Sequence, residues 1–393
     1  MIAVIADDFT GAAEVAGLAF DSGLQVIVGS EVSAELKSGI DVFVAVADTR
    51  SMQRADAVNH IEKLTKDIMA LKPELIYKKV DSVLRGYVHD ELQAQMQSEG
   101  KKKVAILAGN PHFNRLIIDG VFYVDGVKLS ETSFAHDLEF PATSSNVVDL
   151  LNAKDCQVVQ VGEDLPSEGF LMGNVDSVES LSQWAKVLDD TWVLAGGAAF
   201  FECVLACKFP EAKSQNILPR KLYKKGRKTI AFLGSNFPKA NGFEADLQRL
   251  ALLHFNLDEA FFLEYSPELV EQKAKEIVAL SLSNSTVIVS SIFSITNHKL
   301  LTPASIRNIT GELAAAILSY QDFDELFIEG GATAYAIIQK LGVKLLKPEL
   351  ALAPGIIQLK DLNANRTIIT KPGSYQWPAY VVPKTKNQKQ TNL

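Results

Sequence analysis

The chain has 393 residues, of which 47% are hydrophobic and 22% are charged, and this length favours two domains over one. The formal net charge is −8 with the basic residues dispersed, which argues against nucleic acid or an anionic membrane as partner. Three irregularly spaced cysteines exclude a disulfide framework, and the N-terminus shows neither a basic leader nor a membrane-spanning run, so we expect a cytoplasmic protein.

The first half of the chain alternates short apolar runs with helical periodicity, which predicts an α/β domain with a largely parallel sheet flanked by helices. Polar or charged residues directly follow four of the predicted strands. Because the carboxyl ends of parallel strands meet at one edge, where open α/β sheets bind ligands, these residues predict one site. They are Asp7 and Asp8 after strand 1–6, Arg50 after 42–46, the stretch 78–86 after 75–77, and Arg115 after 104–107.

The stretch 78–86 carries the densest set of charges. An arginine such as Arg85 can hold a carboxylate bidentately, lysines add positive charge, and Asp81 can accept or orient a proton. These groups suit a small, acidic, hydroxylated substrate. The alternative is a solvated strand end whose charges pair with one another. For Asp7 and Asp8, helix capping explains one aspartate better than two, which favours a ligand or metal role.

The alternation breaks after residue 120. Residues 121–129 predict a β-hairpin inserted in the first domain, with a type I′ turn at Asp125-Gly126. The polar segment 131–137 predicts an ordered loop or lid, because it keeps an aromatic residue. Strands at 157–161, 171–175 and 192–194 then resume the sheet.

A basic linker is predicted at 219–228 and a second α/β domain at 229–383, followed by a disordered tail at 384–393. Strands are predicted there at 229–233, 260–263, 286–289 and 326–328. Gly330 and Gly331 lie between a strand and a helix, where backbone N–H groups and the helix dipole favour phosphate. Similar but weaker loops contain Gly234, Gly355 and Gly373. The sequence lacks a P-loop, a G-x-G-x-x-G fingerprint, an H-E-x-x-H motif and a nucleophile elbow.

The motifs at 6–12, 78–86, 119–120 and 131–135 resemble the sugar-binding half of the four-carbon acid sugar kinases, and the glycine loops resemble that family's nucleotide-binding half. The resemblance implies that residues 1–218 bind a sugar acid and residues 229–383 bind a nucleotide. It further implies ATP-dependent phosphorylation of a tetronate-type acid at its terminal hydroxyl, with Mg²⁺. A homodimer is expected only as the commonest oligomer.

The resemblance also implies roles for individual residues. As a hypothesis, Arg85 with Lys78 or Lys79 holds the substrate carboxylate and hydroxyls, and Asp8 or Asp81 accepts the hydroxyl proton. The expected catalytic residues are Asp8, Asp81 and Arg85. The expected substrate-binding residues are Asp7, Asp8, Arg50, Lys78, Lys79, Asp81, Ser82, Arg85 and Arg115. The expected nucleotide-binding residues are Gly234, Ser235, Gly330, Gly331, Thr333, Pro354, Gly355, Lys371 and Gly373.

The second half departs from the family pattern at Ala332, where an aspartate is usual. This departure motivates a second hypothesis, a sensor that keeps the sugar-acid site and has lost phosphoryl transfer. A nucleotide-dependent enzyme of another class, such as a dehydrogenase, is disfavoured by the missing dinucleotide fingerprint.

Overall fold

The computed structural model describes residues 1–32, 36, 39–137, 139–212, 227–234, 253–282, 284, 286–291, 301–353, 355–364 and 366–373. The chain divides into two compact units, Met1–Gln215 and Asn216–Leu393. Ser235, Pro354, most of the predicted linker and the predicted tail lie outside the described residues. In the part that is described, no helix is long and apolar enough to cross a membrane.

The first unit is built on a parallel sheet with the strand order β2-β3-β1-β4-β11-β5-β10-β9. Its central strands are continuous apolar runs because both faces of the sheet are covered, and all five residues of β1 are fully buried. The strands are β1 (Ile2–Ala6), β2 (Val26–Gly29), β3 (Val42–Val46), β4 (Leu75–Lys79), β5 (Lys103–Leu107), β9 (Cys156–Val159), β10 (Gly169–Gly173) and β11 (Trp192–Gly196).

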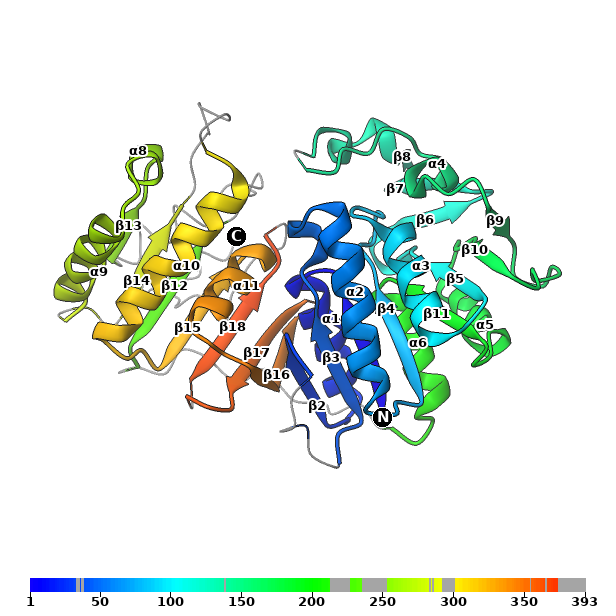
Figure 1. Ribbon diagram of the computed structural model, residues 1–393, viewed down its shortest axis with the longest axis horizontal. Helices are drawn as coiled ribbons and strands as arrows, with labels where there is room; N and C mark the ends of the chain where they lie inside the picture. Colours follow the sequence, from blue (N-terminus) through cyan, green and yellow to red (C-terminus); the bar gives the residue numbers. More distant parts are fainter. Residues whose placement is uncertain are drawn as a thin grey trace, which may run out of the picture. The chain divides into compact units, whose positions relative to one another are not determined.

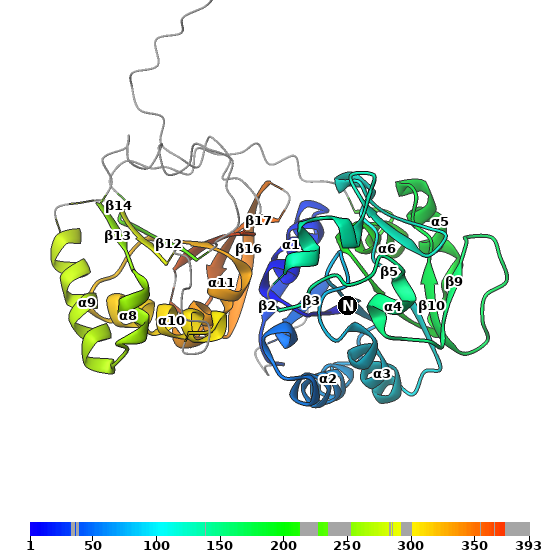
Figure 2. The same cartoon turned by 90° about the horizontal axis from the view of Figure 1, so that it is seen from above.

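Helices cover both faces of this sheet (Figure 2). One face carries α1 (Phe9–Asp21), α5 (Val178–Val187) and α6 (Ala198–Lys208), and the other carries α2 (Arg54–Met69) and α3 (Val88–Glu99). A short helix, α4 (Val147–Leu151), precedes β9. The core under α2 includes Ile5, Phe43 and Ile61, so alternate strand residues serve opposite faces.

A small antiparallel sheet follows β5, with the order β6-β7-β8 (Figure 1). It consists of β6 (Arg115–Ile118), β7 (Val121–Val124) and β8 (Val127–Lys128). Asp125 and Gly126 have φ angles of 50° and 79°, the left-handed pair that a type I′ turn requires. The predicted hairpin is therefore confirmed, with β6 as an additional strand. Two 3₁₀ turns, η3 (Leu129–Glu131) and η4 (Ser133–His136), occupy the predicted ordered loop.

The second unit contains a mixed sheet with the order β13-β14-β12-β15-β18-β17-β16. The five strands β13, β14, β12, β15 and β18 are parallel to one another, whereas β17 is antiparallel to both β18 and β16. The strands are β12 (Thr229–Leu233), β13 (Leu253–Asn256), β14 (Thr286–Ser290), β15 (Glu325–Glu329), β16 (Leu345–Ala353), β17 (Ile356–Asp361) and β18 (Thr367–Lys371). Among the described helices, α10 (Pro303–Tyr320) packs between α9 (Pro267–Ser281) and α11 (Gly331–Lys340) (Figure 1).

The predicted strand at 260–263 is wrong, because these residues form the helix α8 (Glu259–Leu263), and the strand β13 lies earlier. A short apolar run has no periodicity that separates a strand from a buried helical turn. Asp258 caps this helix, since its side chain accepts a hydrogen bond of 3.0 Å from the Phe261 N–H, which favours the helical state. The wider prediction, an α/β protein with largely parallel sheets flanked by helices, is confirmed.

Candidate active site

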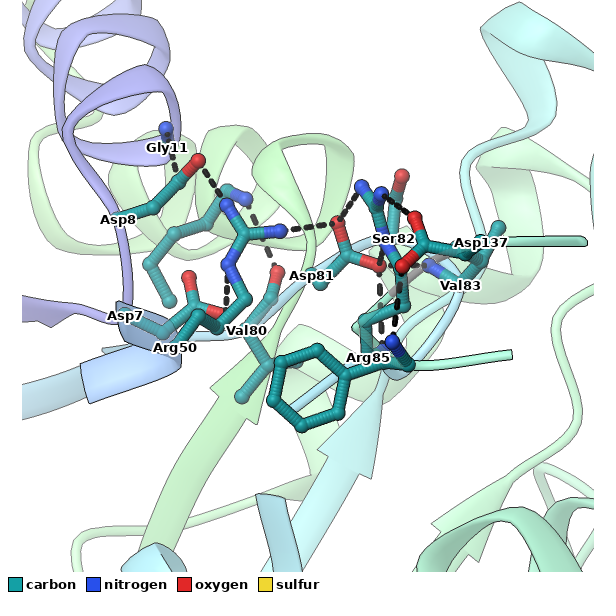
Figure 3. A network of polar contacts seen from close by, with 12 residues as sticks. Asp7, Asp8, Gly11, Arg50, Val80, Asp81, Ser82, Val83, Arg85 and Asp137 are labelled. Atoms are coloured by element: carbon teal, nitrogen blue, oxygen red, sulfur yellow. Dashed lines mark hydrogen bonds and ion pairs between the residues drawn. The ribbon is translucent and has the colours of Figure 1, made fainter. Parts of the chain in front are cut away.

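The candidate site lies at the carboxyl edge of the first unit's sheet, where β1, β3 and β4 end side by side. Ala6 at the end of β1 is in register with Val46 on β3 and with Lys79 on β4. The loops that follow these strands therefore emerge next to one another, as the sequence predicted. Figure 3 shows the network of polar contacts that their side chains form.

Arg50 lies among three carboxylates (Figure 3). It sits on the 3₁₀ turn η1 (Thr49–Ser51) after β3, and its side chain is 17% exposed. Its Nε lies 3.5 Å from Asp7 Oδ2, its Nη1 donates to Asp81 Oδ1 at 3.1 Å, and its Nη2 pairs with Asp8. Asp8 also caps α1, because its Oδ1 accepts a hydrogen bond of 2.7 Å from the Gly11 N–H. One guanidinium group thus joins carboxylates from two different loops.

Asp81 is the most heavily bonded carboxylate of the network. It accepts backbone hydrogen bonds of 3.2 Å from both Val83 and Arg85, and Arg85 Nε and Nη2 add bonds of 3.0 and 2.8 Å. Burial alone would raise the pKa of Asp81, but the charge and hydrogen bonds of Arg85, with Arg50 and Lys79, hold that pKa far below its ordinary value. Asp81 is therefore a stable carboxylate at neutral pH.

Asp137 is a second carboxylate on Arg85 that sequence reasoning missed. Arg85 Nη1 donates to Asp137 Oδ2 at 3.0 Å, while Asp137 Oδ1 accepts from the Glu139 and Phe140 N–H groups at 3.0 and 2.8 Å. Burial opposes ionisation of Asp137, but these hydrogen bonds and Arg85 together lower its pKa. The residue follows η4 and not a strand, so strand-end reasoning could not select it; its place just after the motif at 131–135 was the available signal.

Arg115 and Ser82 join the site from β6 and from the loop after β4. Arg115 Nη1 donates a hydrogen bond to Ser82 Oγ. The ring of Phe134 lies near both arginines, with its centroid 5.7 Å from Arg85 Cζ and 5.7 Å from Arg115 Cζ. The two predicted arginines are therefore neighbours across one aromatic ring.

The two predicted lysines point to opposite faces of β4, because side chains alternate along a strand. Lys78 is fully buried on the face covered by α3, and its Nζ lies 2.6 Å from Glu91 Oε2. Lys79 lies on the face covered by α1, where its Nζ donates to the Val80 carbonyl at 2.9 Å and lies 3.7 Å from Glu14 Oε2. The structure thus brings Lys79 toward the first turn of α1 and places Lys78 inside the core.

The predicted glycine loops of the second unit converge on the carboxyl end of β15. The Gly330 N–H donates to the Lys371 carbonyl at 2.9 Å, and the Gly234 N–H donates to the Glu329 carbonyl at 3.2 Å. Gly330 has a φ of 98°, which only glycine adopts readily, and it precedes α11 without a side-chain cap. A Cβ on Gly234 would overlap the Thr333 side chain.

A buried ion pair supports these loops. Lys371 Nζ lies 3.3 Å from Glu329 Oε2 and donates to the Pro372 carbonyl at 2.7 Å, and both side chains are 1% exposed. Gly355, with a φ of 70°, immediately precedes β17, whose first residues lie beside the end of β18, and Gly373 lies two residues after that end. Close backbone approach and uncapped N–H groups fit the phosphates of a nucleotide. The described residues contain no group of three or more acidic, histidine or cysteine side chains that could hold a metal ion by themselves.

Residues 2–200 match the family model for a sugar-binding N-terminal domain. The chain belongs to the four-carbon acid sugar kinase family.

Three relatives with named activities show how distant the similarity is. The chain is 32% identical to a D-threonate kinase of Salmonella typhimurium over 149 residues, which cover 38% of this chain and 35% of that protein. It is 22% identical to a 3-oxo-tetronate kinase of Brucella melitensis over 412 residues, covering 96% of this chain and 94% of that protein. A D-erythronate kinase of Heliobacterium modesticaldum is 25% identical over 253 residues, covering 60% and 57% of the two chains.

Two solved structures share the fold. One from Salmonella typhimurium LT2 has a TM-score of 0.76 at 19% identity and covers 97% of this chain and 98% of its own. Haemophilus influenzae protein HI1011 has a TM-score of 0.71 at 20% identity, covering 96% and 98%. At these identities the similarity shows the fold alone.

The buried Asp81 carboxylate makes a testable contribution to stability. Its folded-state pKa is lowered from an unfolded value of about 3.9, so its contribution is present above that pH and is lost as the pH falls further. We expect Asp81→Asn to lower the free energy of unfolding at pH 7 by about 3 kcal/mol, as when a buried ion pair is broken. Below about pH 4 the difference from the wild type should shrink.

Urea unfolding between pH 3 and pH 7 measures this difference. Asp56→Asn, at an exposed aspartate of α2, is the control and should follow the wild type throughout. A constant gap between Asp81→Asn and the wild type across that range would contradict the expected coupling to ionisation.

Proposed function

We propose that this protein is an ATP-dependent kinase that phosphorylates a four-carbon sugar acid of the threonate, erythronate or oxo-tetronate type at its terminal hydroxyl. The polar network around Arg50, Asp81 and Arg85 carries the proposal, because it offers fixed acceptors and donors for a small polyhydroxylated acid. The named activities of the relatives support this class of substrate. Residues 1–218 as the sugar-acid domain, a cytoplasmic location and a homodimer remain predictions.

Phosphoryl transfer depends on positioning and on charge stabilisation more than on covalent chemistry. In this site the acceptor hydroxyl needs a carboxylate that can take its proton. Asp81 suits that role poorly, because its many donors lower its pKa and a general base works best with a pKa near the working pH. Asp8 has one Arg50 contact and one backbone hydrogen bond. We therefore propose that Asp8 is the general base and that Asp81 positions Arg50 and Arg85.

The second unit supplies the proposed nucleotide site. The N–H groups at the start of α11 and the close backbone approach at Gly234 support binding of the ATP phosphates by Gly330, Gly331 and Thr333. Mg²⁺, when bound with the nucleotide, neutralises phosphate charge.

Ala332 supports a second candidate function, a sensor that binds the sugar acid without phosphorylating it. Titration calorimetry with ATP and Mg²⁺ separates the candidates. A kinase binds the nucleotide and releases or absorbs heat. A sensor that no longer binds the nucleotide gives no heat.

ADP release in the presence of ATP and Mg²⁺ tests the activity directly. We expect turnover with at least one of D- and L-threonate, D- and L-erythronate, 2-oxo-tetronate and 3-oxo-tetronate, because the relatives are named for acids of this size. No turnover with any of these acids, from protein shown to be folded, would contradict the proposed activity.

Asp8→Asn tests the assigned base. Asparagine is as good an N-cap as aspartate, so its side-chain oxygen can still accept the Gly11 N–H while the proton acceptor is lost. We expect kcat to fall by roughly 10²- to 10⁴-fold with little change in melting temperature.

The control is Asp258→Asn, which makes the same change at the cap of α8. It should leave both kcat and the melting temperature near the wild-type values. Retention of kcat within about threefold in Asp8→Asn would exclude Asp8 as the base.

Gly234→Ala tests the nucleotide site. The added Cβ overlaps the Thr333 side chain, so the loop must shift, and we expect the affinity for ADP to fall by at least tenfold while the sugar acid still binds. Calorimetry with each ligand measures both effects. Gly342→Ala is the control in the same unit: its Cβ meets no atom within 4 Å, but its φ of 65° costs stability. Equal ADP affinity in Gly234→Ala and the wild type would place the nucleotide elsewhere.

A further inference from the structure

We propose that Arg115 is the residue that binds the carboxylate of the substrate and thereby gives the site its preference for acids over neutral polyols. This inference rests on the proposed function and assigns a specificity-determining residue to that same site. The supporting observation is which of the site's basic side chains already form ion pairs with acidic side chains of the protein.

Four of the five cations predicted for the site already have acidic partners. Arg85 donates through Nε and Nη2 to Asp81 and through Nη1 to Asp137, which uses three of its five N–H bonds. Arg50 contacts three carboxylates, Lys78 pairs with Glu91, and Lys79 lies 3.7 Å from Glu14.

Arg115 differs from these four cations. Its guanidinium donates to the hydroxyl of Ser82 and lies against two aromatic rings, 6.0 Å from the Phe113 centroid and 5.7 Å from that of Phe134. No carboxylate among the described residues forms an ion pair with it. A hydroxyl and two rings leave its full charge uncompensated, so an incoming carboxylate gains most by binding here.

The backbone fixes Arg115 in place. The Asn110 N–H donates to the Arg115 carbonyl at 2.7 Å, and the Arg115 N–H donates to the Asn110 carbonyl at 3.1 Å, which ties the start of β6 to the loop after β5. These two backbone hydrogen bonds fix the Cα of Arg115 and leave its guanidinium group free of them. A receptor that is ordered before the ligand arrives loses less entropy on binding.

Phe134 and Asp137 direct the carboxylate away from Arg85. The Phe134 ring contacts both guanidinium groups, and Asp81 and Asp137 place two negative charges directly on Arg85. A substrate carboxylate near Arg85 would meet the two carboxylates bound there, whereas no carboxylate of the described residues lies within ion-pair distance of Arg115. The acid end of the substrate therefore binds at Arg115, which leaves the terminal hydroxyl for the aspartates at the start of α1.

The ratio of two dissociation constants tests this assignment. Calorimetry measures the Kd of the acid that the wild type turns over and the Kd of the polyol of the same stereochemistry, threitol or erythritol, which lacks the carboxylate. In the wild type we expect the acid to bind much more tightly. In Arg115→Gln we expect acid affinity to fall roughly 100-fold, so that the ratio approaches one, because a charge-assisted hydrogen-bonded pair is lost. Arg115→Lys should restore part of the preference.

Arg54→Gln is the matched control, because it removes an arginine that is 62% exposed and pairs with Asp90 outside the site. It should keep the wild-type ratio. If Arg115→Gln is unstable in thermal melts, Arg115→Lys alone tests the assignment. It keeps the charge but loses the guanidinium fork, so its preference for the acid should be weaker than that of the wild type.

The outcomes distinguish this inference from the proposed function. If the wild type prefers the acid and Arg115→Gln keeps that preference, Arg115 is not the carboxylate receptor, although the kinase proposal stands. If Arg85→Gln removes the preference while Arg115→Gln keeps it, the carboxylate binds Arg85. If the wild type neither binds nor turns over any of the acids, the proposed function fails, and the inference with it.

Discussion

The buried carboxylate of Asp81 is the contact on which the rest of the candidate site depends. Outside water such a group must find several donors, and here they come from two backbone N–H groups and from Arg85 and Arg50. The loop after β4 turns back on itself to supply them, with Leu84 in the left-handed region at a φ of 62°. Because Arg50 arrives from the loop after β3, the same carboxylate also fixes where that guanidinium meets Asp7 and Asp8.

The alternation of side chains along β4 gives two adjacent lysines different surroundings. Lys78 and Glu91 form a fully buried ion pair that links the strand to α3, which is tolerated because each charge compensates the other. Lys79 points to the opposite face, toward the first turn of α1, where a Cβ on Gly11 would lie 3.1 Å from its Nζ. The sequence shows two equivalent basic residues at a strand end. Only the alternation of side chains between the two faces of the sheet places one in the core and the other beside the candidate site.

The sequence predicted those features that follow from local periodicity and failed where tertiary packing or capping decides. Apolar runs such as Ile2–Ala6 identified the strands, and parallel pairing then brought Asp7, Arg50 and Asp81 to one edge. The run at 260–263 was assigned wrongly, because its helical state depends on the Asp258 cap and not on periodicity. Asp137 was missed because it follows η4 and not a strand. Its contact with Arg85 depends on how that segment packs, which no strand pattern encodes.

The sites proposed for the two units use different parts of the polypeptide, and this difference bears on Ala332. The first unit presents charged side chains, so a single substitution there removes a specific contact. In the second unit Gly330 precedes α11 without a side-chain cap, and the groups suited to phosphate are backbone N–H groups beside the Lys371–Glu329 pair. An alanine at position 332 leaves those N–H groups and their support in place. The missing aspartate therefore removes one carboxylate from the loop but not the geometry on which the proposed phosphate binding depends.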